Sequence, residues 1–124
     1  MTDVVTLQLP RERDYFGVAH LVLGGLGARL DLTYDVLEDM TTAIDELLNR
    51  RDSSEDVTLK VMIEDKAITA TVGPFGSRVA DELHASDAGL GLRRVLETVV
   101  DKVDVSQRDG AHWVVLTKNL NGAG

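Results

Sequence analysis

Two stretches of alternating apolar and polar residues constrain the fold of this chain more than any other feature. Apolar residues occupy every second position from Val57 to Ile63, and the same pattern resumes from Ile68 to Val72. Alternation of this kind is typical of β-strands that bury one face. The polar residues Glu64-Asp65-Lys66 between the two stretches favour a turn, so the sequence predicts a β-hairpin in the middle of the chain.

Helical periodicity precedes this hairpin and returns after it. One helix is expected over residues 11–30, and a second begins at Thr33, a residue type that caps helix N-termini. A third helix is expected from Gly89, after an irregular segment with one helical turn around residues 78–83. The predicted buried residues of the second helix are Val36, Met40, Ala43, Ile44, Leu47 and Leu48, and those of the third are Leu92, Val95, Leu96, Val99 and Val100. Gly17, Gly24, Gly25 and Gly27 in the first helix predict a close approach to a neighbouring element.

Strands near the two ends complete the predicted fold. Residues 4–9 alternate crudely up to Pro10, and Asp109-Gly110 is a strong turn signal between two late strands. The order β-α-α-β-β-α-β-β predicts an α+β two-layer sandwich, in which three helices cover one face of a mixed, mostly antiparallel sheet of about five strands. Residues 1–118 are expected to form a single domain, and residues 119–124 a flexible C-terminal tail.

The composition narrows the range of partners and cofactors. A formal net charge of −8 argues against a nucleic-acid partner, because the phosphates carry charge of the same sign. The chain has no cysteine, and its three histidines lack metal-ligand spacing, so no metal-ligating residue is assigned. No apolar run is long enough to span a membrane and the N-terminus has no signal-peptide pattern, so a cytoplasmic protein without a membrane partner is expected.

The segment Gly89-Leu90-Gly91-Leu92 stands where the third helix begins. Glycines at a helix start leave backbone N–H groups open, and the positive end of the helix dipole favours an anion there. The same glycines also suit the ordinary geometry of a chain turning into a helix. Both interpretations stay open on the residues alone.

The chain resembles the small anti-sigma-factor serine kinases, which are histidine-kinase-like (GHKL, Bergerat-type) ATPases. The resemblance rests on the element order and on three phrases: Ala43–Leu47, Gly89–Leu92 and Gly110–Leu116. It implies that ATP lies between the second helix, the glycine loop after the middle hairpin and the second glycine segment. It also implies a magnesium ion, a homodimer, and a sigma factor or an antagonist protein as partner.

This resemblance assigns roles to individual residues. Glu46 would be the catalytic residue that assists phosphorylation of a serine. The nucleotide-binding residues would be Asn49, Arg50, Gly73, Gly76, Gly89, Gly91 and Leu92. None of them is assigned as a metal ligand, because the family pattern is broken at the position where its asparagine would hold magnesium.

The break lies on the second helix. The family pattern places glutamate and asparagine four residues apart on one helix face, but Arg50 follows Glu46 at that spacing and Asn49 lies about 100° away around the axis. Arginine has donors and no acceptor, so it cannot ligate a cation, and we expect Arg50 to pair with Glu46 instead. A register that uses Asp45 and Asn49 restores the spacing but points both away from the buried stripe.

A second break concerns the adenine base. The family strand ends with an aspartate that accepts a hydrogen bond from the adenine amine. Alignment on Gly76 puts Pro74 at that position, and alignment on Gly73 puts Thr71 there; neither carries a carboxylate. The loss of one buried hydrogen bond is worth about 1–3 kcal/mol and weakens selectivity for adenine.

These observations predict an anti-sigma-factor-like regulatory protein that binds a sigma factor, an antagonist protein or both, and whose ATP site is degenerate and weak. The alternative is an active ATP-dependent serine/threonine protein kinase that acts on an anti-sigma-factor antagonist through Glu46. A third interpretation is an adaptor module that shares only the fold.

Overall fold

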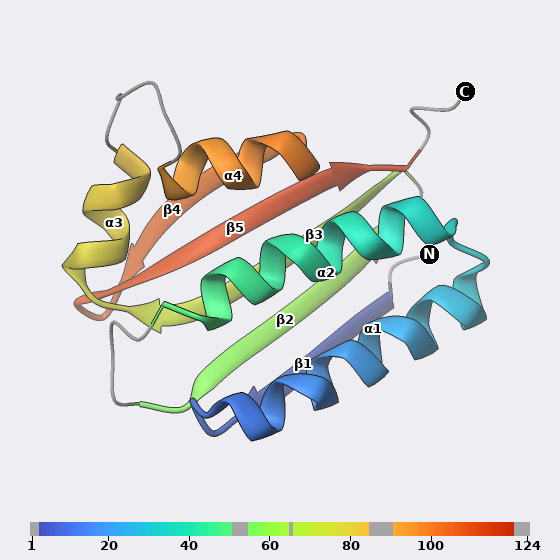
Figure 1. Ribbon diagram of the computed structural model, residues 1–124, viewed down its shortest axis with the longest axis horizontal. Helices are drawn as coiled ribbons and strands as arrows, with labels where there is room; N and C mark the ends of the chain where they lie inside the picture. The colour runs from blue at the N-terminus through green and yellow to red at the C-terminus, as the bar shows by residue number, and fades with distance from the viewer. Residues whose placement is uncertain (1–2, 51–54, 65, 85–90, 121–124) are drawn as a thin grey trace.

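The computed structural model describes residues 3–50, 55–64, 66–84 and 91–120. The strands and helices follow one another along the chain in the order shown in Figure 1: β1 (Asp3–Leu9), the 3-10 helix η1 (Arg13–Tyr15), α1 (Phe16–Leu30), α2 (Tyr34–Leu48), β2 (Val57–Glu64), β3 (Ala67–Phe75), α3 (Ser77–His84), α4 (Leu92–Val99), β4 (Lys102–Arg108) and β5 (Ala111–Asn119). No helix within these ranges is long and apolar enough to cross a membrane.

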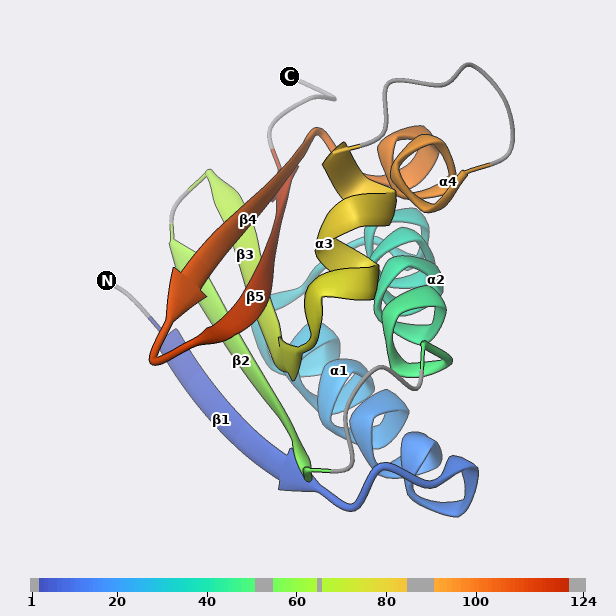
Figure 2. The same cartoon turned by 90° about the vertical axis from the view of Figure 1, so that its left-hand side faces the viewer.

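The strands form one sheet with the order β1-β2-β3-β5-β4. Every neighbouring pair is antiparallel. The helices lie together against one face of the sheet, and the other face is open, as Figure 2 shows. The predicted α+β sandwich is therefore confirmed; among the described residues no strand pair is parallel, and the helical layer contains four α-helices where three were expected.

Both predicted hairpins are present. In the first, β2 and β3 pair from Thr58 opposite Gly73 to Glu64 opposite Ala67. In the second, Asp109 and Gly110 link β4 to β5 with φ angles of 51° and 79°. Two successive residues with positive φ make the turn that matches the twist of antiparallel strands, which explains the signal read from this dipeptide.

Residues 73–84 of the segment predicted to be irregular are more regular than expected, and residues 85–88 lie outside the described part of the chain. Strand β3 continues to Phe75, with a register shift against β5 between Val72 and Phe75. Gly73 and Pro74 interrupt the apolar alternation at this shift, so the pattern in the sequence stops before the strand does. The single predicted helical turn is the two-turn helix α3, which buries Val79, Ala80 and Leu83.

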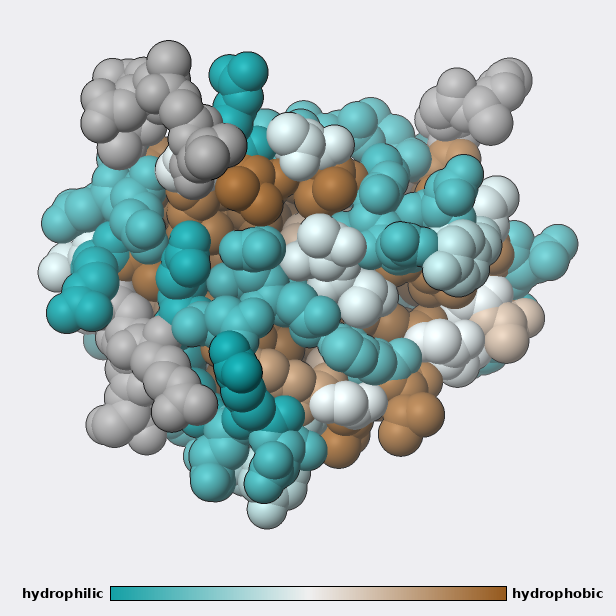
Figure 3. Space-filling model, in the orientation of Figure 1, coloured by the Kyte–Doolittle hydropathy of each residue, from teal (hydrophilic) through white to brown (hydrophobic). Residues whose placement is uncertain are grey.

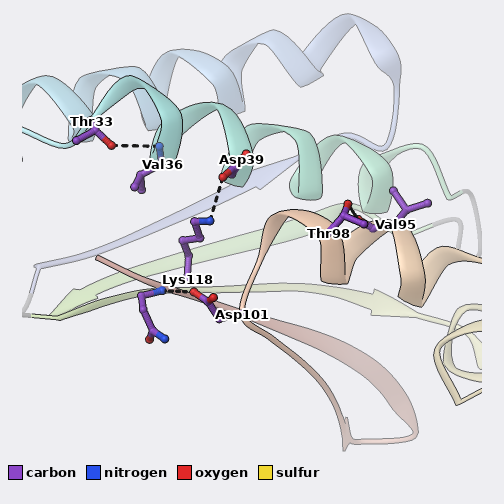
Figure 4. Close-up of polar contacts among 8 residues, drawn as sticks. Thr33, Val36, Asp39, Val95, Thr98, Asp101 and Lys118 are labelled. Carbon is purple, nitrogen blue, oxygen red and sulfur yellow. Dashed lines mark hydrogen bonds and ion pairs between the residues drawn. The ribbon is translucent and has the colours of Figure 1, made fainter. Parts of the chain in front are cut away.

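The starts of two helices also differ from the expectation. Residues 11–15 contain a 3-10 turn before α1 begins at Phe16. Helix α4 begins at Leu92 with Gly91 as its N-cap, while Gly89 lies outside the described residues. The predicted start of α2 is confirmed, because the Thr33 hydroxyl accepts a hydrogen bond from the Val36 N–H at 3.3 Å, as drawn in Figure 4.

The core lies between the helical layer and the sheet. From the predicted stripe of α2, Met40, Ala43, Ile44, Leu47 and Leu48 are at most 1% exposed, whereas Val36 is half-buried. In α4, Leu92 and Leu96 are fully buried and Val95 and Val99 are half-buried. The sheet contributes inward-facing residues that include Leu59, Val61, Ala70, Val72, Val114 and Leu116.

One of the four glycines of α1 makes the predicted close approach. A Cβ atom on Gly27 would overlap the side chain of Leu37, where α1 crosses α2. A Cβ on Gly17, Gly24 or Gly25 would meet no atom within 4 Å. Within the described residues, packing therefore explains Gly27 and leaves the other three on the open side of α1.

Candidate functional site

The C-terminal end of α2, the end of β3 with the following α3, and the start of α4 lie at one end of the molecule (Figure 1). This arrangement brings together three of the segments that the sequence singled out. Glu46 lies in the last turn of α2, Asn49 is the C-cap of that helix and Arg50 follows it, while Gly76 precedes α3 and Gly91 precedes α4. We take this end of the molecule, defined by these five residues, as the candidate site.

Two flanks of α2 carry different polar contacts at this end. On the flank facing α1, Asp45 lies 2.7 Å from Nε2 of His20. The amide of Asn49 donates to the backbone carbonyl of Asp45 at 2.9 Å. The Asp45–Asn49 register therefore points toward α1 and is engaged in contacts within the helical layer.

The other flank faces α3. The guanidinium of Arg50 lies 3.4 Å, from Nε to Oε2, from Glu82 on α3. This contact replaces the predicted pair between Arg50 and Glu46, which is wrong. Glu46 lies in the last turn of α2; it is half-buried and makes no hydrogen bond or ion pair with any residue in the described part of the chain. Nε of Arg50 is buried without a hydrogen-bond partner there, because the approach of Glu82 lacks hydrogen-bond geometry.

The first glycine segment, residues 73–76, packs tightly. A Cβ on Gly73 would lie 2.6 Å from the ring of Trp113, on the face of the sheet away from the helices. Thr71 shares that outward orientation, because Ala70 and Val72 point into the core. The Arg11 guanidinium donates to the carbonyl of Pro74 at 2.6 Å and stacks 5.2 Å from the centroid of Phe75. Gly73 thus fits a packing role, and Gly76 directly precedes α3.

The second glycine segment is described from Gly91 onward. Gly91 is exposed, and no side chain caps the first turn of α4. Leu92 is fully buried in the core, so its side chain cannot contact a ligand at the surface. Arg93 secures the turn: it donates to the carbonyl of Leu83 at 2.9 Å, to that of Val103 at 3.2 Å, and to the carboxylate of Glu97 at 3.2 Å.

The residues at this end do not fit a magnesium ion. The side-chain amide of Asn49 is on the α1 flank, and the position four residues after Glu46 carries a cation. Among the described residues, no three histidine or carboxylate side chains gather closely enough to hold a metal. The end of β3 likewise offers a proline and an outward threonine where an adenine-binding carboxylate would be needed.

A separate hollow of about 310 Å³ lies at the opposite end of α2, between its first turns and the end of β5. Its walls include Asp35, Asp39, Lys118 and Leu120. The ammonium of Lys118 donates to Asp39 at 2.9 Å, so the two opposite charges in this hollow already neutralise each other (Figure 4).

Three residues that contact the segments around the candidate site were not singled out from the sequence: Arg11, Glu82 and Arg93. Their partners on other elements lie between 10 and 63 residues away along the chain, so no local pattern reveals them. Only the Arg93–Glu97 pair carries a sequence signal, the i, i+4 spacing of opposite charges on a helix.

The chain is similar over almost its whole length to proteins named serine-protein kinase RsbW. It is 30% identical to the one from Bacillus velezensis, over 97% of this chain and 88% of the relative. The protein from Bacillus subtilis is 29% identical with the same coverage, and one from Listeria monocytogenes is 25% identical over 98% of this chain and 90% of the relative. No protein-family model matches the chain.

A solved structure shares the fold. The crystal structure of the RsbU and RsbW domains of Rv1364c from Mycobacterium tuberculosis superposes on 95% of this chain with a TM-score of 0.69 at 16% sequence identity. The present chain spans 32% of that longer chain. The match shows that this solved structure contains the same fold, an antiparallel sheet with helices on one face.

Proposed function

This chain belongs to the RsbW family of serine-protein kinases, with the histidine-kinase-like fold, and on that premise we propose that it is an anti-sigma-factor-like regulator. It binds a sigma factor, an antagonist protein or both. The observation that carries this proposal is the end-to-end similarity to the RsbW kinases, which covers 97% of the chain. A cytoplasmic location and a role without nucleic acid belong to the same proposal, the latter supported by the charge of −8.

The nucleotide site of this regulator is, in our proposal, degenerate and weak. Glu46, Asn49, Arg50, Gly76 and Gly91 border it, and Gly89 and Leu90 complete its glycine segment in the sequence. The support is chemical: a guanidinium replaces the amide that would hold magnesium, and no carboxylate is available for the adenine amine. ATP and magnesium therefore bind weakly, and partner binding proceeds without them.

The outer side of α1 is the surface that suits a protein partner or a second copy of the chain. Leu21 is 77% exposed and Val18 is 37% exposed, and Gly17, Gly24 and Gly25 leave the backbone beside them open. Figure 3 shows apolar surface at the edge of the molecule that α1 forms. Three glycines that weaken a helix without an internal packing role are consistent with close approach by another chain.

The test is binding of purified sigma factors and antagonist proteins from the source organism to the full chain, with and without Mg-ATP. We expect complex formation that does not depend on nucleotide and that is lost in Leu21→Asp. Tyr34→Asp is the matched control, because Tyr34 is 75% exposed at the start of α2, away from the outer side of α1. Failure of all these proteins to bind would contradict the proposal and favour an adaptor role. The molecular mass of the chain in solution tells whether it forms a dimer.

The second candidate is an active serine kinase that uses Glu46. It is favoured by one feature: Glu46, in the last turn of α2, is half-buried without a partner among the described residues. An active kinase would transfer labelled phosphate to a serine of an antagonist protein, and Glu46→Gln would abolish the transfer. No transfer to any tested antagonist would leave the regulator without kinase activity as the function.

A further inference from the structure

The last turn of α3 is held from two sides by arginines of neighbouring helices. Arg50, at the end of α2, faces the side chain of Glu82 at 3.4 Å. Arg93, in the first turn of α4, donates to the carbonyl of the next residue, Leu83, at 2.9 Å. Two successive residues of α3 are thus attached to two different helices.

These two attachments differ in kind. Arg93 is part-buried, and its guanidinium makes three hydrogen bonds, two of them to backbone carbonyls that cannot move without unfolding the elements that carry them. Arg50 has one side-chain partner in the described residues, and its buried Nε lacks a hydrogen bond. Ion pairs as exposed as this one, with 34% and 40% of the side chains accessible, shift an equilibrium by about fivefold or less.

We propose that Glu82 is an autoinhibitory contact, whose carboxylate covers a guanidinium that otherwise binds the phosphate oxygens of a nucleoside polyphosphate without a metal ion. This inference rests on the proposed function, because it assigns the ligand chemistry of the same weak site. Guanidinium groups bind carboxylate and phosphate oxygens with the same planar pair of donors, so the two compete directly for Arg50.

The cationic residue at position 50 supplies charge that would otherwise come from magnesium. An arginine cannot hold a metal ion, but the fixed charge of Arg50 lies beside the last turn of α3, where it faces Glu82. Glu46 lies four residues before Arg50 in the chain, and its negative charge opposes an anion, which limits the affinity. Displacement of Glu82 requires a side-chain rotation alone, because Arg93 and the buried residues Val79 and Leu83 keep α3 in place.

The experiment follows the Nε–H resonance of Arg50 by NMR while magnesium-free tripolyphosphate, and separately ATP with EDTA, is added to the full chain. The resonance is assigned by its loss in Arg50→Lys. We expect Glu82→Gln to bind both ligands roughly two- to fivefold more tightly than the unaltered chain. Glu97→Gln is the matched control, because it removes the same charge from a carboxylate that pairs with Arg93 instead.

Equal affinity of Glu82→Gln and Glu97→Gln would overturn the inference, and so would an Arg50 resonance that responds to neither ligand in any variant. A gain that persists in the double variant Glu82→Gln, Arg50→Gln, measured by calorimetry, would overturn it too. The proposed function fails differently: tight binding of Mg-ATP to the unaltered chain contradicts a weak site, whereas the ratio between the two glutamine variants still decides the role of Glu82.

Discussion

The two ends of α2 differ in their polar contacts. At the N-terminal end, Thr33 caps the helix and Asp39 bonds Lys118, whose side chain is only 19% exposed. At the C-terminal end, Nε of Arg50 is buried without a hydrogen bond, and Glu46 has no partner within the described ranges. Buried polar groups in folded proteins are almost always paired, so the incomplete end is the one where a function is to be sought.

The largest loss of stability is expected when a core residue in either half of α2 is shortened to alanine. Met40 and Leu48 are each at most 1% exposed, the first in the N-terminal half of α2 and the second at its end. Met40→Ala and Leu48→Ala should each lower the free energy of unfolding by about 2–5 kcal/mol, through lost burial and a residual cavity. Urea denaturation measures both values, and a cost near zero at Leu48 would show that the C-terminal end is loosely packed.

An intermediate loss of stability distinguishes the ion pairs at the two ends of α2. Asp39→Asn leaves the largely buried Lys118 ammonium without its ion pair and should destabilise by about 1–3 kcal/mol. Arg50→Met keeps the aliphatic volume and removes only the poorly oriented contact to Glu82, so a change within about 1 kcal/mol is expected. Urea denaturation of the two variants under the same conditions gives both free energies of unfolding. A larger loss of stability in Arg50→Met than in Asp39→Asn would contradict the expected order.

A smaller effect is expected from the helix cap. Thr33→Ala removes the acceptor for the Val36 N–H and should cost about 1 kcal/mol. Thr42→Ala makes the same chemical change at an exposed position inside α2, where alanine is a better helix former. Thermal unfolding should separate the two variants, and equal melting temperatures would argue against the cap.

The strands and long helices could be predicted because their signals are local. Alternation from Val57 to Val72 and the Asp109-Gly110 turn specify the hairpins, and the spacing of apolar residues specifies α2. The end of β3 could not be predicted, since Gly73 belongs to the strand through its pairing with Thr58 of β2, although Gly73 and Pro74 interrupt the apolar alternation. Within the candidate site, the pairing of Arg50 with Glu82 instead of Glu46 depends on how α3 packs, which no local pattern encodes.

Calorimetric titration of the full chain with Mg-ATP and Mg-ADP tests the central claim, that the scaffold of a nucleotide-dependent kinase persists here without the groups that bind adenine and magnesium. The account predicts heats too weak to saturate at millimolar nucleotide. Saturable binding at low micromolar nucleotide would contradict it, because that affinity requires base and metal contacts that Pro74 and Arg50 cannot supply.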